Sequence, residues 1–466
     1  MHLVTRIVRV ATMLAIAASP AAAARRKPAP ALDEPAADSA RWAASFPVER
    51  HVLPNGLVVL MHEDHSVPTV TFWQWFRVGS RNERPGITGI SHFFEHMMFN
   101  GSKNVPPKEY DRIIEANGGD TDAFTGLDMT AYYEDIASDR LEVLLRLDSD
   151  RMASLSLQPE MLKSEIEVVK EERRLRTDNS IPGMLNEQLY AAAFLASPYH
   201  WPVVGWMEDL NRIARDDCVA YFRTYYAPNN CILVLTGDFE PRATLAQIAK
   251  AFGPIPAQPP APTPIVAEPE QRGERRVEVH YPAENASFQV GYKVPGATSE
   301  DVPVLRALGA ILAQGESSRL YRALVYEKQI ALDVGSFFEV RLDPTLFELT
   351  VEMKPGKTAA KGESLLTQTI DRLIEEGPTE RELLKAKNLL EVDFVRSLKT
   401  NNGAGAQLAS YEHLFGDYRV MFGALDKLQA ITVADCRRVA RMYFDPLHRT
   451  VAVLVPESQK PKASAP

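Results

Sequence analysis

The chain repeats part of its own sequence at an interval of 218 residues, and this repeat limits the folds open to it. In each copy a helical segment centred on a cysteine, Cys218 or Cys436, ends in an aromatic pair and a proline and leads into an apolar run, residues 231–235 or 450–454. A coincidental match is the alternative, but both copies close their half of the chain. A Pro-rich stretch at 253–275 separates the halves and should be extended and semi-rigid. We therefore expect a duplication, with this stretch as the linker.

Each half alternates short strand-like runs with longer helical segments. The strand-like runs are 58–61, 70–76, 287–294 and 345–352, and the helical segments are 109–116, 140–155, 304–312 and 380–398. This pattern predicts an α+β fold in which each of two domains packs a mixed or antiparallel sheet against helices.

A run of apolar residues at 89–99 contains the motif His-x-x-Glu-His, formed by His92, Glu95 and His96. On a helix the two histidines lie one turn apart on one face, and two neutral imidazoles at that spacing supply half of a tetrahedral zinc site. Glu95 would lie beside the metal, where a general base can take a proton from a zinc-bound water. The alternative is a buried helix whose polar groups bond only to one another, but such burial is costly without a metal or partners.

A third ligand is expected from a carboxylate on a later helix. The segment 161–175 has apolar residues at helical spacing and no Gly or Pro. Within it, Glu165 and Glu172 are seven residues apart and share a face. One can bind the metal while the other supports the site by a hydrogen bond. Alone, such a helix is also typical of a solvated charged surface; the motif favours the metal interpretation.

These elements resemble the inverted-zincin peptidases of the pitrilysin, insulin-degrading enzyme and mitochondrial processing peptidase family (M16), in a half-length bacterial form. Glu172, which lies 76 residues after His96, matches that family's third zinc ligand, and Glu165 matches its supporting glutamate. Weaker matches are the opening strand, the turn before the zinc helix, the substrate-edge strand and a marker of the second domain, at residues 53–57, 79–83, 118–125 and 315–321. The resemblance covers about residues 46 to 456.

The resemblance implies two domains that face each other as half of a clamshell. It also implies one Zn²⁺ per chain, held by the two histidines of the motif and Glu172. The 218-residue offset places Ala310, Ala313 and Gln314 opposite the zinc motif, so we expect the second domain to be a metal-free copy.

The implied function is that of a zinc-dependent metalloendopeptidase that hydrolyses unfolded peptides or flexible polypeptide segments, with Glu95 as the general base. An extended peptide would pair as an added strand with a substrate-binding segment formed by Asp122, Ala123, Phe124 and Thr125. The alternative is a non-catalytic peptide-binding or assembly subunit of a peptidase complex, because a fold does not establish activity. An intact Glu95 discriminates between the two, since a structural zinc site needs no base.

Two departures from the family pattern concern substrate binding. Asp122 stands where the family usually has Asn, and the second-domain Arg and Tyr of the family, seven residues apart, are replaced by Tyr326 and Asp333. We therefore expect a homologous partner subunit that lacks the zinc motif but carries the Arg/Tyr pair. A homodimer, with Arg319 or another residue serving instead, is the alternative.

The amino-terminal residues predict export. Arg6 and Arg9 precede nine apolar residues, too few to span a bilayer, and a small-residue run follows. We expect a periplasmic or secreted protein with no transmembrane span, an uncleaved amino-terminal membrane anchor being the alternative. Loss of this segment changes the net charge from −9 to −11, which argues against a nucleic-acid partner. The expected layout is a signal peptide at 1–24, a disordered Ala/Pro-rich tether at 25–44, a zinc-binding domain at 45–252, the linker at 253–275, a metal-free domain at 276–456 and a tail at 457–466.

Overall fold

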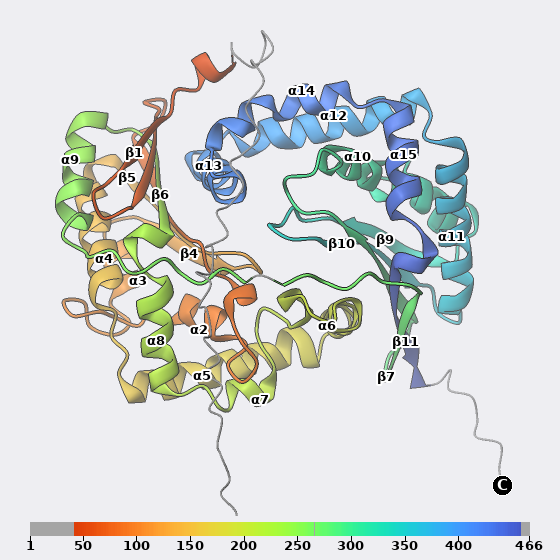
Figure 1. Ribbon diagram of the computed structural model, residues 1–466, viewed down its shortest axis with the longest axis horizontal. Helices are drawn as coiled ribbons and strands as arrows, with labels where there is room; N and C mark the ends of the chain where they lie inside the picture. The colour runs from red at the N-terminus through yellow and green to blue at the C-terminus, as the bar shows by residue number, and fades with distance from the viewer. Residues whose placement is uncertain (1–41, 265, 458–466) are drawn as a thin grey trace, which may run out of the picture.

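Two β-sheets with the same strand order form the framework of the computed structural model, which describes residues 42–457 except residue 265 (Figure 1). The first sheet has the order β1-β2-β6-β3-β5-β4 and the second the order β7-β11-β8-β10-β9. Apart from the additional edge strand β1, the two orders match strand for strand, and each sheet contains one parallel pair, β2 with β6 and β7 with β11. The predicted α+β fold of two duplicated domains is confirmed.

The strands of the first sheet are β1 Glu49–Val52, β2 Val58–Glu63, β3 Thr69–Phe76, β4 Asp120–Thr125, β5 Thr130–Ala137 and β6 Cys231–Gly237. The helices of the same half of the chain are α2 Ile90–Met97, α3 Tyr110–Ala116, α4 Leu141–Ser154, α5 Pro159–Arg173, α6 Ile181–Ala193, α7 Met207–Leu210, α8 Arg215–Tyr225 and α9 Pro241–Phe252. Every residue of β6 is buried, as expected of a central strand covered on both faces, whereas β4 alternates exposed and half-buried residues at the sheet edge.

The second sheet consists of β7 Arg275–Tyr281, β8 Ser287–Val294, β9 Ala331–Phe337, β10 Thr345–Met353 and β11 Arg449–Pro456. The helices of this half of the chain are α10 Val302–Ala313, α11 Ala359–Glu376, α12 Glu380–Ser397, α13 Asn401–Phe415, α14 Ala424–Ala430 and α15 Val433–Tyr443. Two π-helical turns, η3 Arg174–Asp178 and η6 Tyr321–Glu327, complete the elements used below.

The two halves exchange one helix each. Leu185 and Leu189 of α6, in the first half, pack in one cluster with Leu454 of the second sheet. Conversely, α13 of the second half packs on the first sheet, where Gly405 lies so close to the indole of Trp73 that an added Cβ would be 2.6 Å from it. Each sheet therefore has one face covered by a helix from the other half, and the two halves form one packed unit (Figure 1).

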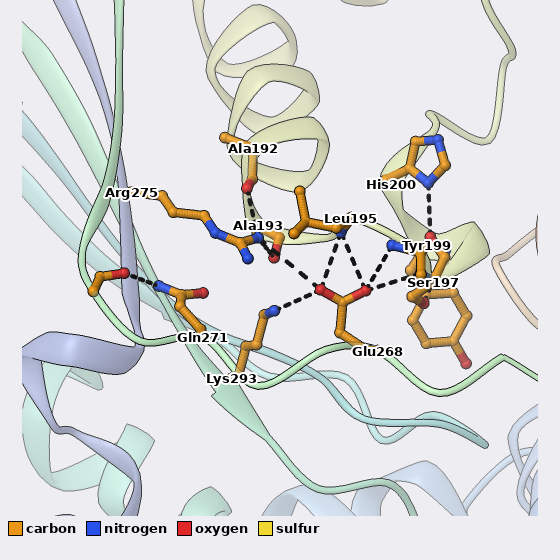
Figure 2. Close-up of polar contacts among 12 residues, drawn as sticks. Ala192, Ala193, Leu195, Ser197, Tyr199, His200, Glu268, Gln271, Arg275 and Lys293 are labelled. Carbon is orange, nitrogen blue, oxygen red and sulfur yellow. Dashed lines mark hydrogen bonds and ion pairs between the residues drawn. The ribbon is translucent and has the colours of Figure 1, made fainter.

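The linker is fastened where α6 ends (Figure 2). The Glu268 carboxylate accepts the backbone N–H groups of residues 195–197 at 2.9–3.1 Å and the ammonium group of Lys293 at 2.8 Å. Although burial opposes it, this set of donors lowers the pKa of Glu268 to about 2. Arg275 donates to the last carbonyls of α6, those of Ala192 and Ala193. These contacts join the linker, the exchanged helix and the second sheet.

The ends of the predicted layout are only partly visible. The predicted signal peptide, the tether up to residue 41 and the tail from residue 458 lie outside the described residues. Residues 42–45, which the predicted tether includes, form a helical turn whose Trp42 ring packs on Phe394 and Phe422 at 5.6 and 4.8 Å between centroids. In the part of the chain that is described, no helix has the length and apolar character needed to cross a bilayer.

Candidate metal centre

The helix α2, which carries the His-x-x-Glu-His motif, is fixed at its first turn by a buried carboxylate. Glu83 accepts the backbone N–H groups of Gly89 and Ser91, both at 2.8 Å, which are donors that the start of a helix leaves unpaired. Burial raises the pKa of Glu83 to about 8, although these hydrogen bonds oppose the shift. Gly89 has a φ of 90°, and a Cβ there would lie 2.4 Å from the carbonyl of Val204. The Glu83 hydrogen bonds and the close packing at Gly89 therefore fix the position of the first turn of α2.

Three side chains converge on one point between α2 and α5. The ring nitrogen Nε2 of His92 is 3.6 Å from one carboxylate oxygen of Glu172, and Nε2 of His96 is 3.2 Å from the other. One potential ligand atom from each of the three residues lies within 4.8 Å of the others. Two imidazole nitrogens and one carboxylate oxygen are the donor set of many catalytic zinc sites, which leave a fourth position open. The residues present therefore fit a zinc ion.

The orientation of His96 is set by a second carboxylate. Glu165 lies two turns before Glu172 on α5; it is 2.9 Å from Nδ1 of His96 and accepts a hydrogen bond from Asn100 at 2.8 Å. This contact leaves Nε2 of His96 directed at Glu172, which is how an outer hydrogen bond orients a metal-binding imidazole. Burial opposes protonation of His96, but the two carboxylates prevail and raise its pKa to about 9 in the absence of a cation.

The orientation of the His92 ring is fixed by burial instead. His92 is 7% exposed, and its Nδ1 atom has no hydrogen-bond partner among the described residues. Its Nε2 atom is the one that lies near Glu172. A buried imidazole with only this polar contact gains most from a metal bound at the same nitrogen.

The end of α5 is anchored so that Glu172 faces α2. Arg173 is buried and donates to the carbonyl of Gly205 at 2.7 Å and to Glu187 at 2.8 Å. The helix changes to the π turn η3 at the next residue, and Arg176 of that turn pairs with Glu172 at 2.8 Å. Arg173 was not among the predicted site residues, because nothing in a basic residue of a charged helix reveals that it is buried.

Glu95, the predicted general base, is half-buried and contacts the edge strand β4. The hydroxyl of Thr125 donates to one carboxylate oxygen of Glu95 at 2.5 Å. Because side chains alternate along a strand, Thr125 and Ala123 lie on the α2 face of the sheet, whereas Asp122 and Phe124 lie on the face that α13 covers. The four predicted substrate-binding residues are thus divided between two faces of one strand.

The outer edge of β4 has no partner strand among the strands described. Its only pairing is with β5, in antiparallel register from Asp120 opposite Asp135 to Thr125 opposite Thr130. An edge strand leaves a row of backbone N–H and C=O groups unpaired. Here that row runs past the carboxylate of Glu95.

The second domain offers no comparable polar centre at the matching place. Tyr326 is 72% exposed on η6, and Asp333 is exposed on β9. Arg319, the residue suggested as a substitute for the missing arginine, donates to both carboxylate oxygens of Glu382, at 2.7 and 2.9 Å, and to the carbonyl of Gly377. Its guanidinium is therefore engaged within its own domain.

The chain is similar to known protein families and proteins along most of its length. Residues 58–205 match the family model described as insulinase (peptidase family M16), and residues 212–390 match the one described as peptidase M16 inactive domain. The zinc protease PqqE of Helicobacter pylori is 32% identical over 417 residues, which cover 88% of this chain and 93% of that protein. The uncharacterized zinc protease YmxG of Bacillus subtilis is 25% identical, with 85% and 96% covered.

Solved structures have the same fold. The crystal structure of a protease from Helicobacter pylori has a TM-score of 0.85 and 30% identity, covering 88% of this chain and all of that one. The periplasmic protease PqqL of Escherichia coli has a TM-score of 0.73 at 17% identity; the match covers 88% of this chain and 48% of that one. At that identity the second comparison concerns the fold alone.

Proposed function

We propose that this chain, which belongs to the insulinase family of peptidases (family M16), is a zinc-dependent endopeptidase that cleaves unfolded peptides or flexible polypeptide segments. The observation that carries the proposal is the convergence of His92, His96 and Glu172 within 4.8 Å, next to a Glu95 that binds none of them. A structural metal site would need the three ligands but would have no use for a fourth, ionisable residue beside them.

In this proposal each residue has one task. His92, His96 and Glu172 would hold the zinc ion, and Glu165 keeps the ring of His96 in place. When bound, zinc supplies a Lewis acid that polarises the scissile carbonyl and makes water acidic enough to react near neutral pH. Glu95 accepts the proton that water loses and returns it to the amine leaving group.

Thr125 contributes to this step through Glu95. Its hydroxyl occupies one carboxylate oxygen of Glu95 and leaves the other free for the proton. Because Thr125 is also the last residue of β4, the strand that would pair with the substrate is tied directly to the base. A peptide added to β4 would thereby have its backbone at a fixed distance from Glu95.

The substrate class follows from the unpaired edge. Backbone pairing with β4 requires a peptide that can become extended, and it uses main-chain groups rather than particular side chains. Unfolded peptides and flexible segments satisfy this requirement, whereas ordered segments of folded proteins already use their backbone groups. Stable folded proteins should therefore resist cleavage.

A partner subunit completes the proposed enzyme. Tyr326 and Asp333 replace the Arg and Tyr that relatives use to position substrate, and Arg319 is bound to Glu382. We propose that a homologous chain without the zinc motif supplies the missing pair from its own second domain. Because oxyanion stabilisation contributes about two to three orders of magnitude in rate, activity should rise by that factor when the partner is added. A homodimer would instead be fully active without it.

The proposed location is the periplasm or the medium. It is supported by the charged, apolar and small-residue segments within residues 1–24. Detection of the mature chain in the periplasmic fraction, with its first residue near position 25, would support this proposal; recovery of the intact chain from membranes would favour the anchored alternative.

The decisive experiment compares wild-type protein with the Glu95→Gln variant on a library of unfolded peptides, with zinc content measured in both. We expect about one zinc per chain in both proteins and a loss of activity of about 10²–10⁴-fold in the variant, since a base is removed and no ligand is. Zinc in both proteins with no cleavage by either, alone or with the homologous chain, would instead identify a non-catalytic peptide-binding subunit.

A further inference from the structure

A cavity of about 300 Å³ lies between the two domains, at the end of β4 where the strand turns into β5. Asp128 and Met129 of that turn line one side, and Phe337 and Phe338 at the end of β9 line another. The helix α13 closes it with His413. The cavity is thus built from both halves of the chain and lies outside the metal centre.

Its most informative wall is the indole of Trp75 on β3. Trp75 is 4% exposed, and its Nε1–H group has no hydrogen-bond acceptor among the residues described. The neighbouring Trp73 differs, because its Nε1–H donates to the carbonyl of Asn402 on α13 at 3.2 Å. A buried donor without an acceptor costs free energy, which a ligand that brings an acceptor would recover.

The cavity is joined to the proposed substrate strand by a row of paired residues. Phe124 of β4 lies opposite Ala131 of β5, which lies opposite Trp75 of β3. Because alanine is small, the ring of Phe124 reaches across it to Trp75, with 5.8 Å between centroids. A peptide that pairs with β4 and continues past Thr125 therefore arrives at the cavity.

The walls are held in fixed positions relative to each other. Asp128 accepts the backbone N–H of Leu342 at 2.8 Å, and Arg81 of the first domain is paired with Asp343 of the second. Asp128 also accepts the hydroxyl of Tyr199 at 2.6 Å. The loop after β9 is thereby docked on the turn after β4, so the cavity does not depend on a movement of the domains.

The lining selects a neutral aromatic side chain. Met129, Phe337 and Phe338 provide apolar surface of the kind that accepts an aromatic ring. Asp128, Arg306 and Glu339 also line the cavity, so charges of both signs are present. The two carboxylates are already paired, Asp128 with Arg81 at 3.6 Å and Glu339 with Arg341 at 2.9 Å. The unpaired indole N–H adds a requirement for an acceptor atom on the ring.

We propose that this cavity is a specificity subsite that binds a tyrosine side chain of the extended substrate, with the phenolic oxygen accepting the hydrogen bond of Trp75. The inference rests on the proposed peptidase function and adds the identity of one preferred residue. It predicts that cleavage occurs at a constant distance from a tyrosine in the sequence.

The test measures binding and cleavage separately. Unstructured peptides that differ only in one residue, Tyr, Phe, Leu or Ala, are bound to zinc-loaded Glu95→Gln protein, which should bind without cleaving. Tyr should bind about tenfold more tightly than Phe, the effect of one hydrogen bond to a buried donor. With wild-type protein and any required partner, moving the Tyr along the peptide should move the scissile bond with it.

Two matched variants locate the effect. Trp75→Phe keeps an aromatic ring but removes the N–H group, so the preference for Tyr over Phe should fall to about one. Trp73→Phe removes an indole N–H that already has a partner and should leave the tenfold preference unchanged. Circular dichroism and thermal unfolding would verify that both variants are folded.

A third variant replaces a residue that is not buried in the core. Phe337 is 50% exposed at the rim, so Phe337→Ala should keep the fold and weaken binding of Tyr and Phe peptides alike. Equal binding of Tyr and Phe by the Glu95→Gln protein, or no effect of Phe337→Ala on either peptide, would overturn the subsite. If tyrosine peptides bind more tightly but wild-type protein cleaves nothing, the subsite is supported and the peptidase proposal is rejected. If wild-type protein cleaves peptides without preferring tyrosine, the peptidase proposal is supported and the subsite is rejected.

Discussion

The helix pair α2–α5 of the first domain and the helix pair α10–α12 of the second occupy equivalent places but contain opposite chemistry. With the 218-residue offset, His92 corresponds to Ala310 and His96 to Gln314. On the second helix of each pair, Glu165 and Glu172 correspond to Leu383 and Leu390, which pack in the core of the second domain. Four polar groups that converge on one point are replaced by apolar contact, apart from Gln314.

The edge strands next to these helices show the same contrast. In the first domain the hydroxyl of Thr125 on β4 bonds to the side chain of Glu95 on α2. In the second domain the hydroxyl of Ser336 on β9 bonds to the backbone carbonyl of Gly309 on α10, at 3.1 Å. With the 218-residue offset applied to β3 and β8, Ser336 corresponds by strand register to Thr121 and not to Thr125. Both edge strands thus carry a hydroxyl that bonds to the neighbouring helix, but from different positions, and only the hydroxyl of the first domain bonds to a group that can transfer a proton. The fold therefore does not determine the chemistry; a few side chains do.

The largest effect is expected from replacing Glu172, the carboxylate ligand that the second domain lacks. Glu172→Gln should lose zinc, and activity should fall by about three orders of magnitude, because the metal contributes several kcal/mol of charge stabilisation. Glu171→Gln, an exposed neighbour, is the matched control and should retain both. Glu165→Gln should weaken zinc binding by about 10–100-fold. Zinc content by mass spectrometry checks this; a fully metallated Glu172→Gln beside an empty Glu171→Gln or Glu165→Gln would mean that another glutamate is the ligand.

The next prediction concerns the cores. Arg151 is 1% exposed and pairs with Glu134 at 2.8 Å and with Asp148 at 2.7 Å. Arg151→Ala should cost about 3–5 kcal/mol in the free energy of unfolding, because two buried carboxylates lose their cation. The offset places Thr369 at the matching position, where its hydroxyl bonds only to the carbonyl of Leu365, so Thr369→Ala should cost about 1 kcal/mol. Equal losses for both variants in urea unfolding would contradict this difference between the cores.

A smaller effect is expected from removing the hydroxyl that donates to Glu95. Thr125→Val should lower kcat by about tenfold with zinc content and KM nearly unchanged, since one hydrogen bond to Glu95 is lost. Thr125→Ser should restore activity, and Ser336→Ala, which removes the hydroxyl between β9 and α10 in the second domain, should leave it unaltered. Steady-state kinetics on one peptide would check this; a change confined to KM would assign Thr125 to substrate binding alone.

The smallest effect is a dependence of stability on pH at the junction of the domains. Glu348 of β10 accepts hydrogen bonds from Tyr190 at 2.7 Å and Asn186 at 3.3 Å, both on the exchanged helix α6. Burial raises the pKa of Glu348 to about 7 from an ordinary value of 4.5. The folded state therefore keeps a proton that the unfolded state releases. The contribution of Glu348 to the free energy of unfolding is lost as the pH rises from about 4.5 to 7.

Replacement by glutamine should remove that loss. Relative to wild type, Glu348→Gln should be more stable at pH 8 than at pH 5 by about 1–3 kcal/mol. Urea unfolding of both proteins at the two pH values gives this double difference. A difference of zero would mean that Glu348 keeps its charge when folded.

The sequence predicted the local features of the candidate metal centre better than its surroundings. The spacing of His92, Glu95 and His96 on one helix, and of Glu165 and Glu172 on another, depends only on helical geometry, so residue types in a row were sufficient to suggest a site. The contact of Thr125 with Glu95 depends on strand register and on the approach of two elements, which no local pattern encodes. Leu175, the last apolar residue of the predicted helical segment 161–175, is exposed, because the helix changes to a π turn just before it.

The exchange of helices also could not be predicted from the chain alone. Leu185 and Leu189 show that α6 has a buried face, but an apolar face does not specify which sheet covers it. The repeat likewise predicted two copies of one domain, each with a sheet, and it placed Ala310 and Gln314 opposite the motif, but it contained no information on how the two copies pack. The unpaired N–H of Trp75 could not be predicted from the sequence either, because it results from where α13 and the loop after β9 meet.

The contrast between the two domains predicts a metal ion in the first domain and none in its copy. X-ray diffraction from crystals of the wild-type protein, collected above and below the zinc absorption edge, tests it directly. We expect one anomalous peak per chain, between α2 and α5 and within bonding distance of His92, His96 and Glu172, and none between α10 and α12. A peak on other residues, or zinc-loaded protein with no peak at these three side chains, would show that His92, His96 and Glu172 do not form the zinc site.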